Sequence, residues 1–349
     1  MSVVLITGSC GLVGSEAARF FIQKGFDVVG IDNNQRKKLF GKEGDTSWIK
    51  KYLMKKYKNY LHYSYDIRNY NNIEKIFKKY NKKIYSIIHC AAQPSHDWAY
   101  KNPRLDFEIN SLSTLNLLEL MKKYCPTSNF IFMSTNKVYG DSPNNFRLKE
   151  YKYRYDLNNN HSNFKGIDED LSLDKSIHSL FGISKTYADL LVQEYGKNFG
   201  LKTVCFRAGC ITGPAHSSAK LHGFLSFLVK NIIQNKNYNI IGYSGKQVRD
   251  NIHSKDLINC FWEYVKKPTS GEVYNIGGGR YSNCSILEAI NLVKDITNIN
   301  VKITKKKTPR VGDHKWYISN CNKFKNDFPK WKQLYDTKKI IEELLECYK

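Results

Sequence analysis

A glycine-rich segment near the start of the chain has the residue types and spacing to bind a dinucleotide. The segment Gly8-Ser9-Cys10-Gly11-Leu12-Val13-Gly14 follows an apolar run over residues 3–6 and opens an amphipathic stretch that extends to residue 24. A second apolar run ends at Asp32, 18 residues after Gly14. Glycines let the backbone approach a pyrophosphate, a helix N-terminus offers free amides, and the acid takes the adenosine ribose hydroxyls. The pattern therefore predicts a strand, a glycine turn, a helix and a second strand that bind NAD.

The acid that closes this unit also indicates which dinucleotide binds. An acidic residue at position 32, in place of a basic one, favours NAD over NADP. Lys37 and Lys38 follow closely and keep NADP open as the alternative. NAD is therefore the expected cofactor.

The basic composition has two competing explanations. The chain has 349 residues, with 55 Lys and Arg against 32 Asp and Glu, which gives a formal net charge of +23. A nucleic-acid-binding protein would concentrate this charge on one face with interleaved aromatic residues. Here the lysines recur in short groups along most of the expected helices. We therefore interpret the charge as a surface composition bias and expect no nucleic-acid partner, although the charge can speed the encounter with an anionic substrate.

Composition further predicts a globular cytoplasmic protein. Hydrophobic residues make up 41% of the chain, and no apolar run approaches the roughly 20 residues needed to span a bilayer. The chain passes from Met1 directly into an expected strand, which leaves no room for a signal peptide, so no membrane partner is expected. The nine cysteines are scattered and form no Cys-x-x-Cys pair, which predicts reduced thiols and no metal site.

Apolar runs alternate with helical patterns along most of the chain. Expected strands lie at residues 85–90, 129–134, 203–207, 238–241 and 273–276, and expected helices lie at residues 104–124 and 178–199. Alternation of this kind predicts an α/β fold with a doubly wound parallel sheet of the Rossmann type. After residue 208 the strands become short. We therefore expect an NAD-binding domain over residues 1–207, and over residues 208–349 a smaller, mainly substrate-binding lobe with some returns to the main domain.

Short strings along nearly the whole chain resemble the extended short-chain dehydrogenase/reductases that act on sugar nucleotides. They are the glycine turn, Asp32-Asn33-Asn34, Asp66-Ile67-Arg68, Ala91-Ala92, Asn110, Ser134-Thr135-Asn136-Lys137-Val138-Tyr139-Gly140, Gly182-Ile183-Ser184-Lys185, Phe206-Arg207 and Gln247-Val248-Arg249-Asp250. Two longer strings, at residues 134–141 and 245–250, look most like the CDP-paratose 2-epimerase (tyvelose epimerase) branch. The resemblance implies a cytoplasmic NAD-dependent epimerase of a nucleotide-activated sugar. It also implies a homo-oligomer, either a dimer or a tetramer.

The resemblance also assigns site residues. The cofactor would be held by Gly8, Cys10, Gly11, Leu12, Val13, Gly14, Asp32, Asn33, Asn34, Asp66, Ile67, Ala91, Ala92, Gln93, Asn110 and Lys185. The substrate would be held by Asn136, Lys137, His216, His222, Arg249, Arg310 and Asp313. Arginine suits this role because its planar fork can grip a phosphate in two places. In the family, Thr135 would hold the reacting sugar oxygen, and Lys185 would bind the nicotinamide ribose and lower the pKa of a neighbouring hydroxyl.

One position departs from the family pattern. The catalytic tyrosine of the family stands four residues before the lysine, where this chain has Phe181, and a phenyl ring cannot transfer a proton. Candidate replacements are Thr135, His178 (one turn back on the same expected helix) and the pair His96-Asp97. The pair lies in the loop after the fourth strand, where this fold places substrate, and it can serve as acid and base. An ordinary polar loop is an equally good interpretation of His96 and Asp97.

Other functions remain open beside the favoured epimerase. In the favoured reaction a sugar carbon is oxidised transiently to a keto group and then re-reduced on the other face. A 4-epimerase or a 4,6-dehydratase is the alternative enzyme, and dehydration needs an additional acid–base pair such as His96-Asp97. A non-catalytic protein that binds NAD and a sugar nucleotide would explain Phe181. The presence of Thr135, Lys185 and Arg249 argues for an enzyme.

Overall fold

The chain folds into two compact units in the computed structural model, which describes residues 2–215, 223–306, 308 and 312–348. Unit 1 comprises Met1–Val138, Leu180–Arg207 and Ile258–Tyr274, and unit 2 comprises Tyr139–Ser179, Ala208–Leu257 and Asn275–Lys349. The segments 139–179 and 258–274 thus fall on the other side of the boundary expected at residue 207. The first contains short 3₁₀ helices and two-residue strands that pair with each other outside the main sheet, and the second supplies most of a helix and an edge strand to that sheet.

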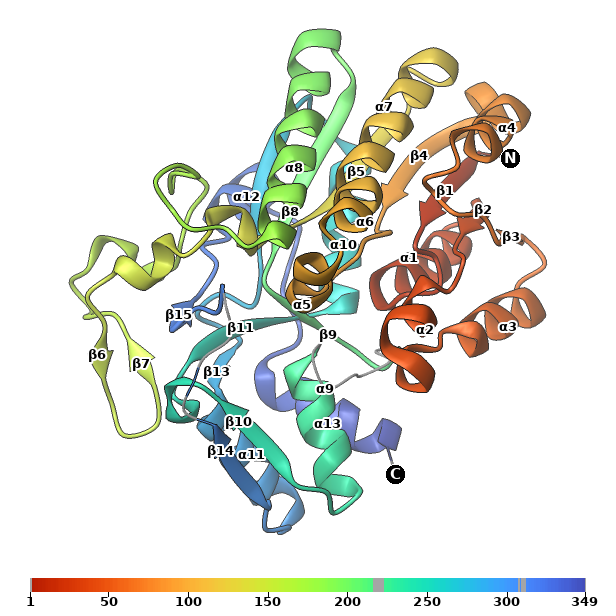
Figure 1. The fold of residues 1–349 in the computed structure, drawn as a ribbon. Coiled ribbons are helices and arrows are strands. Elements are labelled where there is room, and N and C mark those ends of the chain that lie inside the picture. Colours follow the sequence, from red (N-terminus) through yellow and green to blue (C-terminus); the bar gives the residue numbers. More distant parts are fainter. Residues whose placement is uncertain (1, 216–222, 307, 309–311, 349) are drawn as a thin grey trace. The chain divides into compact units, whose positions relative to one another are not determined.

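Unit 1 is built on a sheet of seven strands (Figure 1). The strands are β1 (Val3–Thr7), β2 (Asp27–Ile31), β3 (Tyr60–Tyr63), β4 (Ile84–His89), β5 (Asn129–Thr135), β8 (Lys202–Ala208) and β12 (Glu272–Ile276). Their order is β12-β8-β5-β4-β1-β2-β3, and the pairs β1–β2, β1–β4, β2–β3 and β4–β5 are parallel. The strand order reverses at β1 and β4, whose carboxyl ends are the position at which doubly wound sheets bind ligands. The predicted fold class is confirmed.

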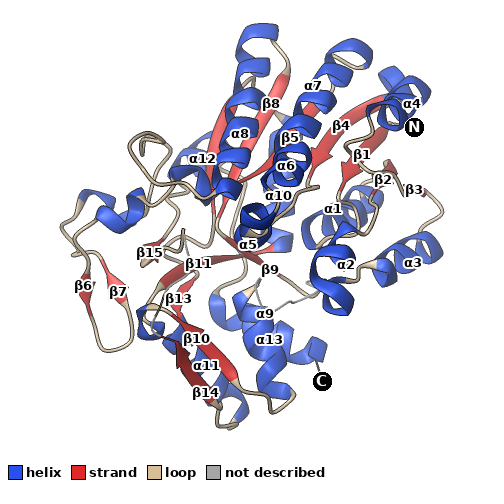
Figure 2. Ribbon diagram, in the orientation of Figure 1, coloured by secondary structure: helices blue, strands red, loops and turns tan. Residues whose placement is uncertain are grey.

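Helices cover both faces of this sheet (Figure 2). They are α1 (Leu12–Gln23), α2 (Gln35–Phe40), α3 (Ser47–Lys56), α4 (Tyr70–Tyr80), α5 (His96–Lys101), α6 (Pro103–Phe107), α7 (Ser113–Tyr124), α8 (Leu180–Phe199) and most of α10 (Ser254–Lys266). On one face α7 packs between α4 and α8. On the other face Trp262 of α10 packs against Phe20 and Phe21 of α1. Because the sheet is covered on both faces, all five residues of β1 are buried.

A π-helical segment interrupts the helix that the sequence predicts over residues 104–124. It comprises Glu108–Leu112, between α6 and α7. The hydroxyls of Ser113 and Thr114 donate to the carbonyl oxygens of Ile109 and Asn110 within it. Such segments are frequent at functional sites because the wider turn re-aims the side chains it carries.

The helix expected over residues 178–199 also differs from the prediction, since α8 begins at Leu180. His178 therefore precedes this helix and belongs to unit 2, so the expectation that it lies one helical turn before Phe181 is wrong. Serine directly before a helical stretch is a common start signal, and the expectation overlooked Ser179 at this position.

Unit 2 consists of small sheets and helices. Its strands are β6 (Lys149–Glu150), β7 (Tyr155–Asp156), β9 (Cys210–Thr212), β10 (Tyr238–Ile241), β11 (Val248–His253), β13 (Asn283–Ser285), β14 (Ile303–Lys306) and β15 (Trp316–Tyr317). Its helices are α9 (Phe224–Ile233), α11 (Ile286–Thr297), α12 (Asn322–Asp327) and α13 (Thr337–Tyr348). A second core lies between α9, α11 and α13. The strand expected at residues 273–276 is β12, which joins the sheet of unit 1 and not this lobe.

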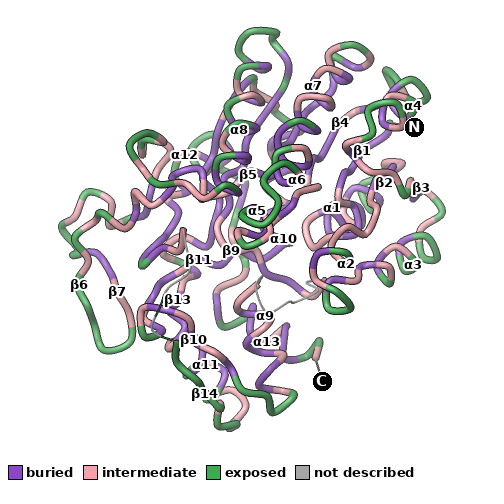
Figure 3. Tube along the Cα trace, in the orientation of Figure 1, coloured by how far each residue is buried: buried purple, intermediate pink, exposed green. Residues whose placement is uncertain are grey.

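The central strands of the seven-stranded sheet are buried, whereas β14 of unit 2 is exposed along its length (Figure 3). All nine cysteines are free thiols, and Cys347 is the exposed one. Among the helices of the described residues, none combines the length and hydrophobicity needed to cross a bilayer.

Candidate active site

The glycine turn after β1 is shaped for the close approach of a ligand. Gly8 has a φ of +67°, and a Cβ atom there would lie 2.7 Å from the backbone nitrogen of Ala91. A Cβ on Gly14 would lie 2.2 Å from the carbonyl oxygen of Gly8. A Cβ on Gly11 would meet that oxygen alone, at 3.3 Å, so the backbone is otherwise open at this point. The first amides of α1 follow directly and have no intrahelical acceptor, which suits a pyrophosphate.

Asp32, directly after β2, is tied to this turn. Its Oδ2 accepts from the backbone N–H of Cys10 at 3.0 Å, and its Oδ1 accepts from that of Asn34 at 2.7 Å. Burial raises the pKa of this carboxyl, against the lowering effect of these hydrogen bonds. Each oxygen retains a further lone pair for a ribose hydroxyl. Lys37, one of the two lysines that kept NADP open, forms an ion pair with Asp45 at 2.9 Å.

Asp66 follows β3 and is held by its neighbours. Asn33 Nδ2 donates to Asp66 Oδ2 at 3.1 Å, and the Arg68 guanidinium donates to the same oxygen at 2.8 Å. Burial alone would raise the pKa of Asp66, but the bonds from Arg68 outweigh it and lower that pKa. The side chain of Ile67 belongs to the core of unit 1, so any contact of Ile67 with a cofactor would come from its backbone.

The loop after β4 is fixed to the turn after β1 through a buried histidine. The Thr7 hydroxyl accepts from the backbone N–H of Ala91 at 3.2 Å and bonds His89 Nδ1 at 2.7 Å. His89 Nε2 lies 3.0 Å from the Thr114 hydroxyl, which in turn donates to the carbonyl oxygen of Asn110. Burial lowers the pKa of His89 to about 3, so its ring is neutral. Two predicted cofactor residues, Ala91 and Asn110, are thereby joined.

Lys185 is buried on α8 and reaches the end of β5. Its side chain is 3% exposed, and its Nζ donates to the carbonyl oxygen of Met133 at 2.6 Å. Burial lowers the pKa of Lys185 to about 8, against the opposing charge of Asp189. Thr135 is the last residue of β5, two positions after Met133, and its hydroxyl accepts from the backbone N–H of Lys137 at 3.2 Å. The ammonium group on α8 thus reaches the end of the strand that carries the threonine hydroxyl.

Phe181, in place of the tyrosine, packs against one of the predicted replacement groups. It is buried on α8, and the ring of His96 meets it edge-on, with centroids 5.1 Å apart and an interplanar angle of 67°. His96 is the first residue of α5, and the next residue, Asp97, is exposed. In unit 2, His178 Nδ1 lies 3.2 Å from the carbonyl oxygen of Ser176. Of the three candidates His96, Asp97 and His178, His96 is the one shown against Phe181.

Unit 2 brings two predicted substrate residues together. Arg249 lies on β11, where its Nη1 donates to the carbonyl oxygen of Val248 at 2.8 Å and its Nη2 forms an ion pair with Asp313. The predicted substrate residues His216, His222 and Arg310 lie outside the described residues. In the part of the chain that is described, no group of three or more His, Cys, Asp and Glu side chains could hold a metal ion.

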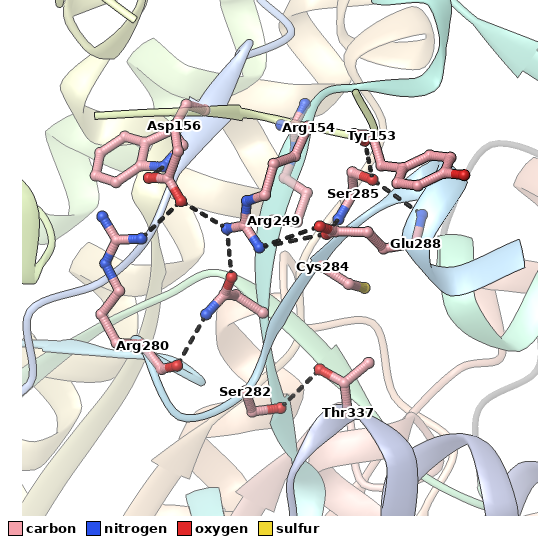
Figure 4. A network of polar contacts seen from close by, with 12 residues as sticks. Tyr153, Arg154, Asp156, Arg249, Arg280, Ser282, Cys284, Ser285, Glu288 and Thr337 are labelled. Carbon is pink, nitrogen blue, oxygen red and sulfur yellow. Dashed lines mark hydrogen bonds and ion pairs between the residues drawn. The ribbon is translucent and has the colours of Figure 1, made fainter. Parts of the chain in front are cut away.

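A polar network supports the strand next to Arg249 (Figure 4). Arg154 forms ion pairs with Asp156 at 3.0 Å and Glu288 at 3.3 Å, and donates to Asn283 Oδ1 at 2.6 Å. Glu288 also belongs to the capping box that starts α11. Because β13 pairs antiparallel with β11, Asn283 and its neighbours lie opposite the strand that carries Arg249. The network thus anchors the β-strand pair that presents this arginine.

Three buried residues of the hydrogen-bond network around Asn110 were not singled out from the sequence: His89, Asp106 and Ser184. His89 could have been found, because a histidine at the end of the largely apolar run Ile84 to Ile88 is unusual in a buried strand. Asp106 lies in a segment with other charged residues nearby. Ser184 lies inside one of the strings that resemble the family. Neither residue therefore stood out from its neighbours in the sequence.

Comparison with known proteins gives a consistent result. Residues 4–277 match the NAD dependent epimerase/dehydratase family. The chain is 33% identical to CDP-paratose 2-epimerase of Salmonella typhi over 334 residues, which cover 93% of this chain and 92% of that protein. It is 28% identical to dTDP-glucose 4,6-dehydratase of Salmonella typhimurium over 362 residues, which cover 99% and 92%. UDP-glucuronic acid 4-epimerase of Bacillus cereus, solved with UDP-glucuronic acid and NAD, has the same fold, with a TM-score of 0.79, 23% identity and coverage of 99% and 98%.

Proposed function

Because the chain belongs to the NAD dependent epimerase/dehydratase family, we propose that it inverts one carbon of a nucleotide-activated sugar. CDP-paratose, inverted at carbon 2, is the first substrate to test. The support is the relative named CDP-paratose 2-epimerase and the strings at residues 134–141 and 245–250. Inversion requires that a sugar hydroxyl lose its proton and that the carbon lose a hydride, both of which later return.

The residues of unit 1 fit NAD. Gly8 and Gly14 leave room for backbone contact only, Gly11 is open, and Asp32 retains acceptor capacity for ribose hydroxyls. When bound, NAD would take a hydride from the sugar carbon and give it back on the opposite face. The ammonium group of Lys185, which is protonated below a pKa of about 8, would stabilise the negative charge that develops on the sugar oxygen.

The contact between His96 and Phe181 is the observation that carries the catalytic assignment. An imidazole can accept and return a proton near neutral pH, and this one lies against the ring that takes the place of the family's tyrosine. His96 would therefore take the proton of the sugar hydroxyl as the carbon is oxidised, and return it on re-reduction. Thr135 would donate a hydrogen bond to the same oxygen, and Arg249 would hold the diphosphate of the substrate.

We also propose that the protein is a homo-oligomer that uses the outer face of α8. Leu180, Ile183, Tyr187 and Leu190 are 42%, 52%, 43% and 46% exposed and recur at helical spacing. An apolar stripe of this kind on a helix favours burial against a second copy. Light scattering should give at least twice the chain mass of 40.6 kDa, and Ile183→Lys should reduce it. A wild-type protein that is monomeric at all accessible concentrations would contradict this proposal.

The test of the activity is a panel of sugar nucleotides incubated in deuterated water and followed by proton NMR and mass spectrometry. Epimerisation by hydride return keeps the substrate mass and leaves protium on the inverted carbon. A dehydratase would instead give a product lighter by one water, with solvent deuterium incorporated. Binding of NAD and a sugar nucleotide without any turnover would support the non-catalytic alternative.

The test of the proton-transfer residue compares variants on the correct substrate. His96→Ala should lower turnover by roughly 10²- to 10⁴-fold, as expected for loss of a general acid–base group. Tyr100→Ala is the matched control, because Tyr100 lies on the same helix and is 80% exposed. Equal turnover in the two variants would refute the role of His96. Alanine at Asp97 and at His178 would then show which of the other candidates carries the proton.

A further inference from the structure

Asp106 is a buried carboxylate that the proposed chemistry does not use. It lies on α6 and is 2% exposed. Its Oδ1 accepts from Gln93 Nε2 at 2.6 Å and from Asn110 Nδ2 at 3.0 Å. Within the described ranges, no ion pair joins it to a lysine or arginine. Burial raises the pKa of Asp106, against the lowering effect of Ser184, of Gln93 and of the charge of Lys185. Burying an acidic group is costly, so this position calls for a structural or functional explanation.

The first partner of Asp106 clamps the residue before His96. Gln93 Oε1 accepts from the backbone N–H of Ser95 at 2.6 Å, and Gln93 Nε2 donates to the carbonyl oxygen of Ser95 at 2.8 Å. Ser95 is in turn the N-cap of α5, since its hydroxyl accepts from the backbone N–H of Trp98. Both backbone groups of Ser95 are therefore fixed by one side chain, and the next residue along the chain is His96.

The second partner of Asp106, Asn110, is connected to Phe181, the other residue of the ring contact with His96. Asn110, on the π-helical segment, donates through Nδ2 to the hydroxyl of Ser184 at 3.1 Å. The hydroxyl of Ser184 donates to the carbonyl oxygen of Phe181 at 3.0 Å. Asn110 also bonds both backbone groups of Gln93, at 2.9 and 3.1 Å. A chain of hydrogen bonds thus runs from Ser95, the residue before His96, through Gln93, Asn110 and Ser184 to Phe181, and the ring contact between His96 and Phe181 closes the circuit.

Asp106 favours the same orientation of the Gln93 amide as the backbone of Ser95 does. The amide of Gln93 has two ends, and only the NH₂ end can donate to a carboxylate, so Asp106 also favours Oε1 facing the N–H of Ser95. A carboxylate accepts from both amides at once, which a neutral apolar side chain cannot do. Without it, the NH₂ end of Gln93 would keep only the carbonyl oxygen of Ser95 as an acceptor, and the side chain that holds Ser95 would be less firmly fixed.

We propose that Asp106 is a positioning residue that, through Gln93 and Ser95, holds His96 against Phe181. The catalytic consequence of this placement rests on the proposed function. The placement itself does not, because the surroundings of His96 can be measured without turnover. It also gives Gln93 and Asn110 a bracing role, since their side-chain groups are engaged within the protein in place of pointing to a cofactor.

The first experiment measures the surroundings of His96 directly. The protein is labelled with 13C-histidine, and the His96 imidazole signal is assigned by its loss in His96→Ala. Asp106→Ala should shift or broaden that signal, and the nearly isosteric Asp106→Asn should move it less, in the same direction. Leu117→Ala is the control, because Leu117 is fully buried on α7 outside the circuit and its loss destabilises the unit in general. An unchanged His96 signal in Asp106→Ala, or an equal change in the control, would overturn the proposal.

The second experiment is a double-mutant cycle on turnover. Asp106→Ala should lower kcat by at least about tenfold, a typical consequence of a misplaced catalytic group, while the KM of the sugar nucleotide and the NAD content stay within about twofold. In the His96→Ala background the same substitution should have no further effect on kcat. Equal losses in both backgrounds would mean that Asp106 does not act through His96. If Asp106→Ala does not fold, Asp106→Asn carries the cycle with a smaller expected loss.

The two experiments separate this proposal from the proposed function. If no sugar nucleotide is turned over, the epimerase assignment fails while the NMR signal still decides the placement of His96. If turnover occurs and His96→Ala leaves it unchanged, the catalytic role of His96 fails, and a shifted His96 signal would still support the positioning by Asp106.

Discussion

Raising the pH should stabilise the protein through Lys185, because no ion pair within the described part of the chain compensates its buried ammonium group. Its Nζ donates to a backbone carbonyl oxygen, and burial lowers its pKa from the ordinary 10.5 to about 8. Below pH 8 the lysine is protonated in both the folded and the unfolded state, so folding must bury a cation. Between about 8 and 10.5 the folded protein releases the proton and the unfolded chain keeps it. The unfolded state then binds more protons, and the free energy of unfolding rises with pH.

The size of the effect follows from the two pKa values. They differ by about 2.5, and each pKa unit corresponds to about 1.4 kcal/mol, so the gain between pH 7 and pH 10.5 is about 3 kcal/mol. The assay is urea unfolding of the wild type and of Lys185→Met, which keeps a long unbranched side chain without a titrating group. Subtracting the two removes the titration of all other residues. A difference between them that does not change with pH would refute this account of Lys185.

Three further outcomes test the cofactor site, the substrate site and the missing tyrosine. Asp32→Asn should weaken NAD binding, measured by calorimetry, by about 1.5–3 kcal/mol for hydrogen bonds to a charged group. Tighter binding of NADP than of NAD by the wild type would contradict the assignment of Asp32 to the adenosine ribose. Arg249→Met should raise the KM of the sugar nucleotide by roughly 10- to 100-fold with NAD still bound, because it removes a charge-assisted contact of about 1.5–3 kcal/mol. An unchanged KM would exclude the contact between Arg249 and the diphosphate. Phe181→Tyr should change turnover only slightly, because His96 already carries the proton, and activity created from none would overturn the enzymatic assignment.

The sequence predicted the family, the fold class and the NAD cofactor, which the comparisons confirm. These follow from local patterns: an apolar strand, a glycine turn and an acid at fixed spacing need no knowledge of tertiary contacts. The same patterns placed β10 at residues 238–241 and located β5 and β8 to within one residue at each end. The roles of the individual site residues remain predictions.

The parts that the sequence did not predict depend on contacts between distant residues. One extra residue in a helix leaves the apolar spacing of residues 104–124 almost intact, so the π-helical segment has no clear mark. A five-residue strand such as β12 does not reveal which sheet it joins, because its edge partner lies far away in sequence. The contact of His96 with Phe181 joins residues 85 positions apart, and only the fold brings them together.

The late return of β12 to the sheet of unit 1 has a consequence for the order in which the protein can fold during synthesis. When the ribosome has released only the first 207 residues, β8 is the last strand of the sheet and its outer edge is unpaired. Phe206 on that strand also lacks Phe261, which stacks on it at 5.4 Å in the finished protein. An open edge with an uncovered aromatic ring favours aggregation. A fragment cut at residue 207 would therefore be prone to self-association, and a split version of the protein must keep residues 258–276 together with the N-terminal half.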